Sequence, residues 1–148
     1  VSGSAAQNQS TGSTTGRPGI LQQTVGTTAT GRAFMMTGSQ NGILLGNSDS
    51  WRLETTARIS NLSDGTNTFT VRLGFIDTDT GESTDGCFFR YTDGTNSGKW
   101  QGVCRNNNTE STCDTGITVA AATFYRLNVK VNAGPPAAGG NPGPPPAR

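Results

Sequence analysis

The densest group of side chains that could do chemistry is an acidic stretch near the middle of the chain. It carries Asp77, Asp79 and Glu82, and Asp85 follows three residues later. A loop rich in carboxylate oxygens can hold calcium, although the glycine and glutamate positions do not match an EF-hand. Paired carboxylates could also serve a glycosidase, but the stretch lacks the aromatic residues that hold a sugar ring. The favoured interpretation is a solvated hairpin loop built from turn-forming residues.

Three cysteines form a second group with reactive side chains: Cys87, Cys104 and Cys113. An odd number allows at most one disulfide within the chain, and no pair has the C-x-x-C spacing. All three could simply be small residues on strands. If a hairpin turns near residues 95–96, Cys87 lies opposite Cys104, which makes this pair the expected disulfide if one forms. Assembly in a reducing cytoplasm would argue against that bond.

Aromatic side chains offer a third kind of chemistry, because they can stack on a carbohydrate. The candidates are Trp51, Tyr91, Trp100 and Tyr125. Aromatic residues at alternating strand positions more often pack in a core, and Trp51 and Tyr125 continue apolar stripes. Trp100 lies between Lys99 and Gln101, so it is the best candidate for an exposed aromatic, although packing is favoured for it too.

Composition excludes several functional classes. Histidine is absent from the 148 residues, which removes Ser-His-Asp and Cys-His catalysis and histidine metal sites. A formal net charge of +1 argues against a nucleic-acid partner, which would call for a basic patch. No apolar run reaches the roughly 18 residues of a membrane span. We therefore expect that the protein is not an enzyme and that it has no catalytic, cofactor-binding or metal-binding residues. We also expect that its partner is neither a nucleic acid nor a membrane.

Apolar residues recur at every second position in three segments, which is the period of a half-buried strand. These segments are residues 51–59, 68–75 and 125–131. Weaker strand candidates are residues 19–24, 31–37, 42–46, 87–92, 98–105 and 110–114. No segment shows helical periodicity. Turn signals separate the strands: Asp-Gly-Thr-Asn at 64–67 and again at 93–96, and three asparagines at 106–108. Short strands with such turns predict an all-β protein, a jelly roll or β-sandwich.

Composition also divides the chain into three parts. Residues 1–16 are small, polar and uncharged, and we expect a polar arm there. Residues 17–132 carry the alternating pattern and should form the sandwich. Residues 133–148 should form an extended arm rich in proline and glycine. Its six prolines, which we expect to bind a partner, are Pro135, Pro136, Pro142, Pro144, Pro145 and Pro146.

The central region resembles a domain of tailed-phage structural proteins. The resemblance is carried in order by residues 17–22, 26–33, 73–77, 85–91, 96–101, 105–110 and 124–127, with Val129 and Asn132. It implies a concanavalin-A-like jelly roll of the kind found in tail fibres and head proteins. The related domain continues with further strand sequence after Asn132, whereas a proline-rich arm follows here. One sheet edge is therefore expected to be open or to be completed by a neighbour.

The resemblance and the composition together favour a structural virion protein. The leading interpretation is a capsid cement or decoration protein. It would be made in the host cytoplasm, bind the outer surface of the phage head and stabilise the joints between major capsid proteins. A homotrimer or another homo-oligomer is expected, because closed symmetry protects sheet edges. The alternative is a glycan-binding, receptor-binding module of a tail fibre.

Overall fold

The computed structural model describes residues 6–8, 21–25, 31–35, 50–92 and 94–132. Eight strands lie in these residues, and no α-helix does; one 3₁₀ turn, η1 (Asn96–Gly98), precedes a strand. The strands are β1 (Ala6–Asn8), β2 (Gln22–Thr24), β3 (Trp51–Arg58), β4 (Thr70–Ile76), β5 (Gly86–Thr92), β6 (Lys99–Asn106), β7 (Thr109–Thr118) and β8 (Phe124–Val131). The all-β prediction is confirmed.

The chain divides into two compact units, residues 1–43 and 44–148. In the first unit, β1 pairs antiparallel with β2, with Gln7 opposite Gln23. Residues 6–8 were expected to belong to a polar arm, but they form a strand instead. Among the described residues, the strands of the sandwich lie in the second unit, from Trp51 onward, whereas composition placed the start of the sandwich at residue 17. The expected strand at 42–46 and the six prolines of the C-terminal segment lie outside the described residues.

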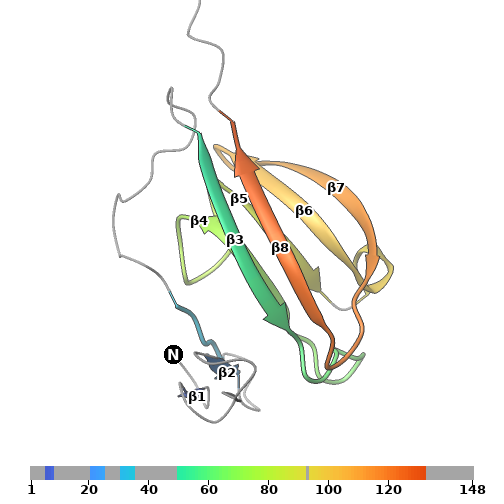
Figure 1. The fold of residues 1–148 in the computed structure, drawn as a ribbon. Helices are drawn as coiled ribbons and strands as arrows, with labels where there is room; N and C mark the ends of the chain where they lie inside the picture. Colours follow the sequence, from blue (N-terminus) through green and yellow to red (C-terminus); the bar gives the residue numbers. More distant parts are fainter. Residues whose placement is uncertain (1–5, 9–20, 26–30, 36–49, 93, 133–148) are drawn as a thin grey trace, which may run out of the picture. The chain divides into compact units, whose positions relative to one another are not determined.

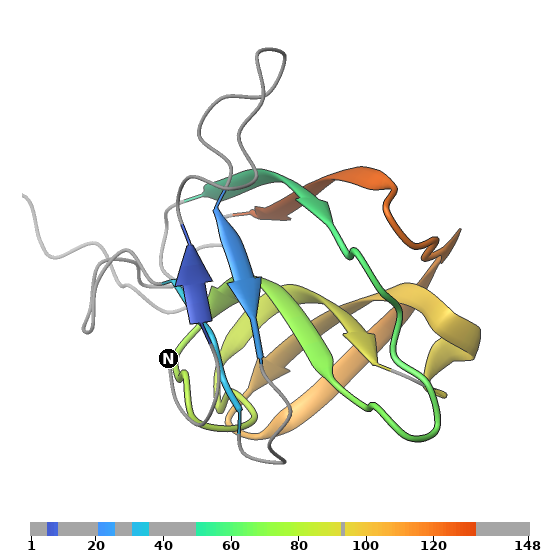
Figure 2. The ribbon, with the colours of Figure 1, turned by 90° about the horizontal axis from the view of Figure 1, so that it is seen from below.

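The sandwich has two antiparallel layers (Figures 1 and 2). One layer is a four-stranded meander in the order β4-β5-β6-β7, and the other pairs β3 with β8. The β3–β8 ladder runs without interruption from the pair Trp51–Val131 to the pair Arg58–Phe124. Along β3, half-buried and exposed residues alternate strictly, as the period-two pattern of 51–59 predicted.

Asparagine and aspartate shape the turns as their side-chain chemistry predicts. Asn107 and Asn108 have φ of 47° and 64°, which closes a two-residue hairpin between β6 and β7. The Asp64 carboxylate accepts hydrogen bonds from the backbone N–H groups of Thr66 at 2.8 Å and Asn67 at 2.6 Å. Both turns therefore use residues whose local chemistry favours a turn.

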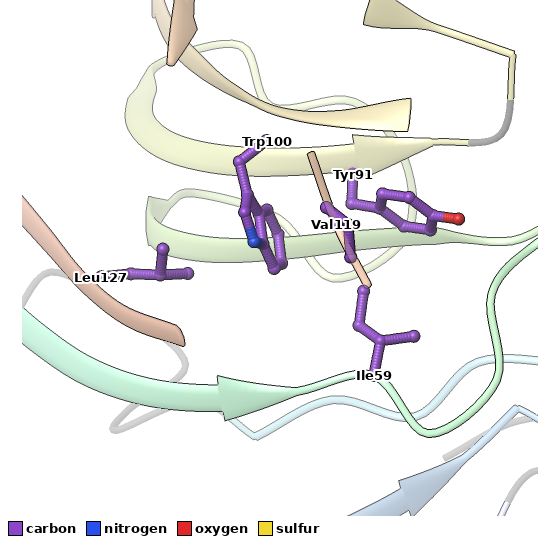
Figure 3. Packing of buried hydrophobic residues seen from close by; sticks show 5 residues of the cluster. All are labelled: Ile59, Tyr91, Trp100, Val119 and Leu127. Atoms are coloured by element: carbon purple, nitrogen blue, oxygen red, sulfur yellow. The ribbon is translucent and has the colours of Figure 1, made fainter. Parts of the chain in front are cut away.

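Trp100 lies at the centre of the core between the two layers (Figure 3). Its side chain is 1% exposed. Its ring meets Tyr91 and Tyr125 edge-on, at centroid separations of 6.2 and 6.0 Å. Ile59, Val119 and Leu127 complete the buried cluster. The sequence marked Trp100 as the best candidate for an exposed aromatic because its two neighbours are polar. Those neighbours point away from the core, and strand alternation turns Trp100 into it.

Replacing Trp100 by alanine should lower the free energy of unfolding by roughly 3–5 kcal/mol, because it leaves a large cavity between the layers. The control is Ile117→Ala, since Ile117 is an apolar residue that is 52% exposed. This control should cost no more than about 0.5 kcal/mol. Urea unfolding of the full chain measures both values, and a similar small cost for both would contradict the described core.

Candidate functional site

The acidic stretch between β4 and β5 uses its aspartates to hold backbone. Both Asp77 oxygens accept hydrogen bonds, from the backbone N–H groups of Thr84 and Asp85, each at 3.1 Å. The Asp85 carboxylate in turn accepts the N–H of Asn107 in the β6–β7 hairpin at 2.8 Å. Among the described residues, no three His, Cys, Asp or Glu side chains are grouped so as to hold a metal ion. Asp77 and Asp85 thus fasten the stretch to the sheet.

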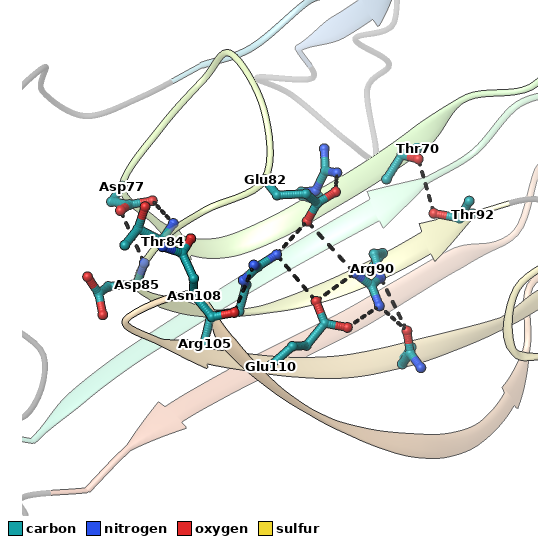
Figure 4. A network of polar contacts seen from close by, with 12 residues as sticks. Thr70, Asp77, Glu82, Thr84, Asp85, Arg90, Thr92, Arg105, Asn108 and Glu110 are labelled. Carbon is teal, nitrogen blue, oxygen red and sulfur yellow. Dashed lines mark hydrogen bonds and ion pairs between the residues drawn. The ribbon is translucent and has the colours of Figure 1, made fainter.

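Glu82, the single glutamate in the sequence of this stretch, lies against arginines from three strands (Figure 4). It forms an ion pair with Arg72 of β4. It also contacts Arg90 of β5 at 3.8 Å and Arg105 of β6 at 3.3 Å. By strand alternation, these arginines lie on the face of the four-stranded sheet opposite to Tyr91 and Trp100, which we call the outer face. A single carboxylate therefore connects three strands.

Glu110 extends the connection to β7. Its carboxylate accepts hydrogen bonds from Arg90 at 2.7 and 3.1 Å, and one oxygen lies 3.5 Å from Arg105. Gln101 of β6 also accepts a hydrogen bond from Arg90, at 2.8 Å. The five charged residues Arg72, Glu82, Arg90, Arg105 and Glu110, which we call the charged brace, tie all four strands together on one face.

Apolar side chains lie on the same face of the sheet as the charged brace. Phe88 and Val103, each 2% exposed, share the outer face with Arg90 and Arg105. Gly74 lies opposite Phe88 in the ladder, and a Cβ at this glycine would collide with the Phe88 backbone. The strands therefore approach closely at Gly74, and the arginines share this face of the sheet with two buried apolar side chains.

Burial and hydrogen bonding both shift pKa values within the brace. The side chains of Arg90 and Arg105 are only 15% and 13% exposed. Burial, followed by the neighbouring positive charges of Arg90 and Arg105, lowers the pKa of Arg72. Hydrogen bonds from Arg90 lower the pKa of Glu110. Three positive and two negative groups give the brace a net charge of +1, so the two glutamates offset most of the repulsion among the arginines.

A disulfide reinforces the sheet on its inner face. Cys87 of β5 and Cys104 of β6 are directly opposite each other, as the hairpin register predicted, and they are bonded. Cys113 of β7 is a free, exposed cysteine on the same face. Next to the disulfide, a cleft of about 320 Å³ opens between this sheet and β8. Its lining includes Phe89, Gly102 and Val129, so it is mainly apolar.

Sequence reasoning identified part of this site. It named the acidic stretch and the cysteine pair but not the three arginines, each of which resembles any solvent-facing strand residue. Tyr91 and Trp100, considered as stacking platforms, are buried at 3% and 1% exposure. Trp51 and Tyr125, expected in the core, are half-buried.

Comparison with known proteins places the chain in a family. Residues 16–137 match the family described as SO2946-like, C-terminal domain, and the chain belongs to this family. No curated protein and no solved structure matches it. In the part of the chain that the structure describes, no helix has the length and apolar character needed to cross a membrane.

Removing the charge of Glu82 should destabilise the sandwich, because three partly buried guanidinium groups lose a shared partner. Glu82→Gln should cost about 1–2 kcal/mol, a value reduced for the partial exposure of Glu82. The control is Glu54→Gln, which removes a carboxylate that pairs with exposed Arg52 and Arg126 on the other layer. Its cost should stay below about 0.5 kcal/mol. Equal costs in urea unfolding would show that the brace adds nothing beyond ordinary surface pairs.

The brace should also make stability depend on pH through Glu110. Because folding lowers the pKa of Glu110, its contribution is complete above the unfolded value of about 4.3 and is lost as the pH falls through the lower, folded value. The difference in melting temperature between wild type and Glu110→Gln should therefore be largest near neutral pH and shrink in acid. A difference that is constant from neutral to strongly acid pH would contradict this assignment.

Proposed function

We propose that the protein is a structural component of a phage virion, a cement or decoration protein on the outer surface of the head. The observation that supports this role best is the charged brace, which together with the disulfide ties four strands side by side. The resemblance to tailed-phage structural proteins points in the same direction. The proposed binding partner is the major capsid protein, and the proposed task is to stabilise the joints between its copies.

The brace suits a protein that carries load. Tension across a sheet acts on the hydrogen bonds between strands, and a covalent or ionic link between the same strands adds resistance. Cys87–Cys104 supplies one such link on the inner face, and Glu82 and Glu110 supply the others on the outer face. Many copies bound over capsid joints would add their interface energies and oppose the pressure of packaged DNA.

The polar, near-neutral composition fits dense packing of identical copies. Charged residues make up 14% of the chain and the net charge is +1. Neighbouring copies therefore repel one another weakly. In this proposal the protein is made in the host cytoplasm and forms a homo-oligomer on the head.

The C-terminal segment is proposed to bind across the joints. Its six prolines fix backbone φ angles, which lowers the entropy lost when an extended segment binds in a groove. At about 3.1 Å per residue, the residues from 134 to 148 would span roughly 45 Å, enough to reach a second subunit.

The glycan-binding alternative is less well supported. Exposed aromatic side chains are a common stacking surface for sugars, and two of the four candidates, Trp100 and Tyr91, instead fill the core. Their burial favours the decoration role over the tail-fibre role.

Deleting residues 134–148 should leave the melting temperature nearly unchanged and strongly reduce binding to capsids. Co-sedimentation with undecorated capsids measures the binding, and thermal melts measure the fold. A chain of full length with the six prolines replaced by alanine is the matched control for length, and it should bind with intermediate affinity. Equal occupancy by the full-length and shortened chains would exclude the segment from binding.

A further inference from the structure

The outer side of β7 is an open sheet edge. β6 pairs with one side of β7, and no strand within the described residues pairs with the other. Nine of the ten residues of β7 are exposed. The opposite edge of the sheet differs, because six of the seven residues of β4 are half-buried. Of the two edges of the four-stranded sheet, β7 is therefore the one at which another strand could bind.

Between Thr109 and Asp114, this edge lacks the usual protection against pairing. Soluble proteins commonly place lysine or proline on an edge strand, or charges that repel an incoming strand. β7 contains no lysine, arginine or proline. Its two acidic residues bind cations of their own sheet: Glu110 binds Arg90 at 2.7 Å, and Asp114 binds Lys99 at 2.8 Å. Their charges are compensated and do little to repel another strand.

A bulge limits the length of the open edge. The β6–β7 register shifts after the pair Gln101–Asp114, and Gly116 has a left-handed φ of 74°. Bulges bend a strand and interrupt regular pairing. The continuous ladder covers Thr109 to Asp114, so this segment is the part available to a partner.

The charges on this segment favour a second copy of β7 in one register. In an antiparallel pair, directly opposite residues point to the same face of the sheet, whereas neighbours along one strand point to opposite faces. When a two-fold axis relates two copies of the same strand, the pair must therefore be centred on a residue that lies opposite its own copy. A centre at Thr112 would place Glu110 opposite Asp114, and a centre at either acid would place that acid opposite itself. A centre at Cys113 would extend the pairing into the bulge. A centre at Ser111 avoids both problems, because Glu110 then lies opposite Thr112.

We propose that β7 pairs antiparallel with β7 of a second copy, centred on Ser111, and joins the two four-stranded sheets into one. The pair places both charged braces on the same face of the joined sheet. The β7–β7 pair also covers an edge that could otherwise pair with strands of unrelated proteins. This dimer does not depend on the proposed virion role, and a soluble chain that never meets a capsid would form it.

The mass of the full-length protein in solution, measured by light scattering over a range of concentrations, tests the pairing. Wild type should form a dimer. Ser111→Lys places two like charges opposite each other and should raise the dimer Kd roughly fivefold or more. Ile117→Lys adds the same charge beyond the bulge and should leave the Kd unchanged. A monomer at every concentration, a trimer, or an equal effect of both substitutions would overturn the proposal.

Cross-linking tests the register even if a lysine variant fails to fold. Single cysteines are introduced by Ser111→Cys or Thr112→Cys in a Cys113→Ser background and exposed to oxidised glutathione. Two thiols become one intermolecular disulfide, and two reduced glutathione molecules are released. Directly opposite cysteines of this sheet can bond, as Cys87 and Cys104 do at a Cα separation of 4.2 Å. Ser111→Cys should cross-link fastest. Faster cross-linking of Thr112→Cys, or of Cys113 in the wild type, would overturn the register.

Discussion

The burial of Trp100 between the two layers is the interaction on which the rest of the structure depends. It joins Tyr91 of the same sheet to Tyr125 of the other, and so fixes which face of the four-stranded sheet is the inner one. Once Trp100 points inward, strand alternation places Gln101 on the outer face, and Arg90 lies opposite it in the ladder. The charged brace is thus a geometric consequence of the aromatic core.

The two faces of the four-stranded sheet are stabilised by different interactions. The inner face buries apolar area and carries the Cys87–Cys104 bond, which holds two neighbouring strands in register. The outer face holds the strands side by side through carboxylates that each contact more than one arginine. Salt screens partly buried ion pairs less than fully exposed ones. The contribution of the brace to stability should therefore depend less on salt concentration than that of ordinary surface pairs.

Local patterns predicted the fold well because its strands follow local rules. The alternation at 51–59 and 125–131, the asparagine turn at 106–108 and the opposition of Cys87 and Cys104 depend on residues close in sequence or joined by one hairpin. The brace was not predictable in this way. Arg72, Arg90 and Arg105 meet Glu82 only because two ladders, β4–β5 and β5–β6, fix their registers together. Packing was favoured for Trp100, yet its polar neighbours still made it the best candidate for an exposed aromatic, because such neighbours mask a buried strand residue. The strand at 6–8 was missed because uncharged polar residues give no periodic signal.

The central functional claim is that this braced sandwich works as a repeated structural part of a phage head. The most direct measurement is the copy number of the protein relative to the major capsid protein, by densitometry of purified virions separated into heads and tails. The decoration role predicts that the protein stays with the heads at a fixed ratio, in numbers comparable to the capsid subunits. A few copies per particle that remain with the tails would contradict it.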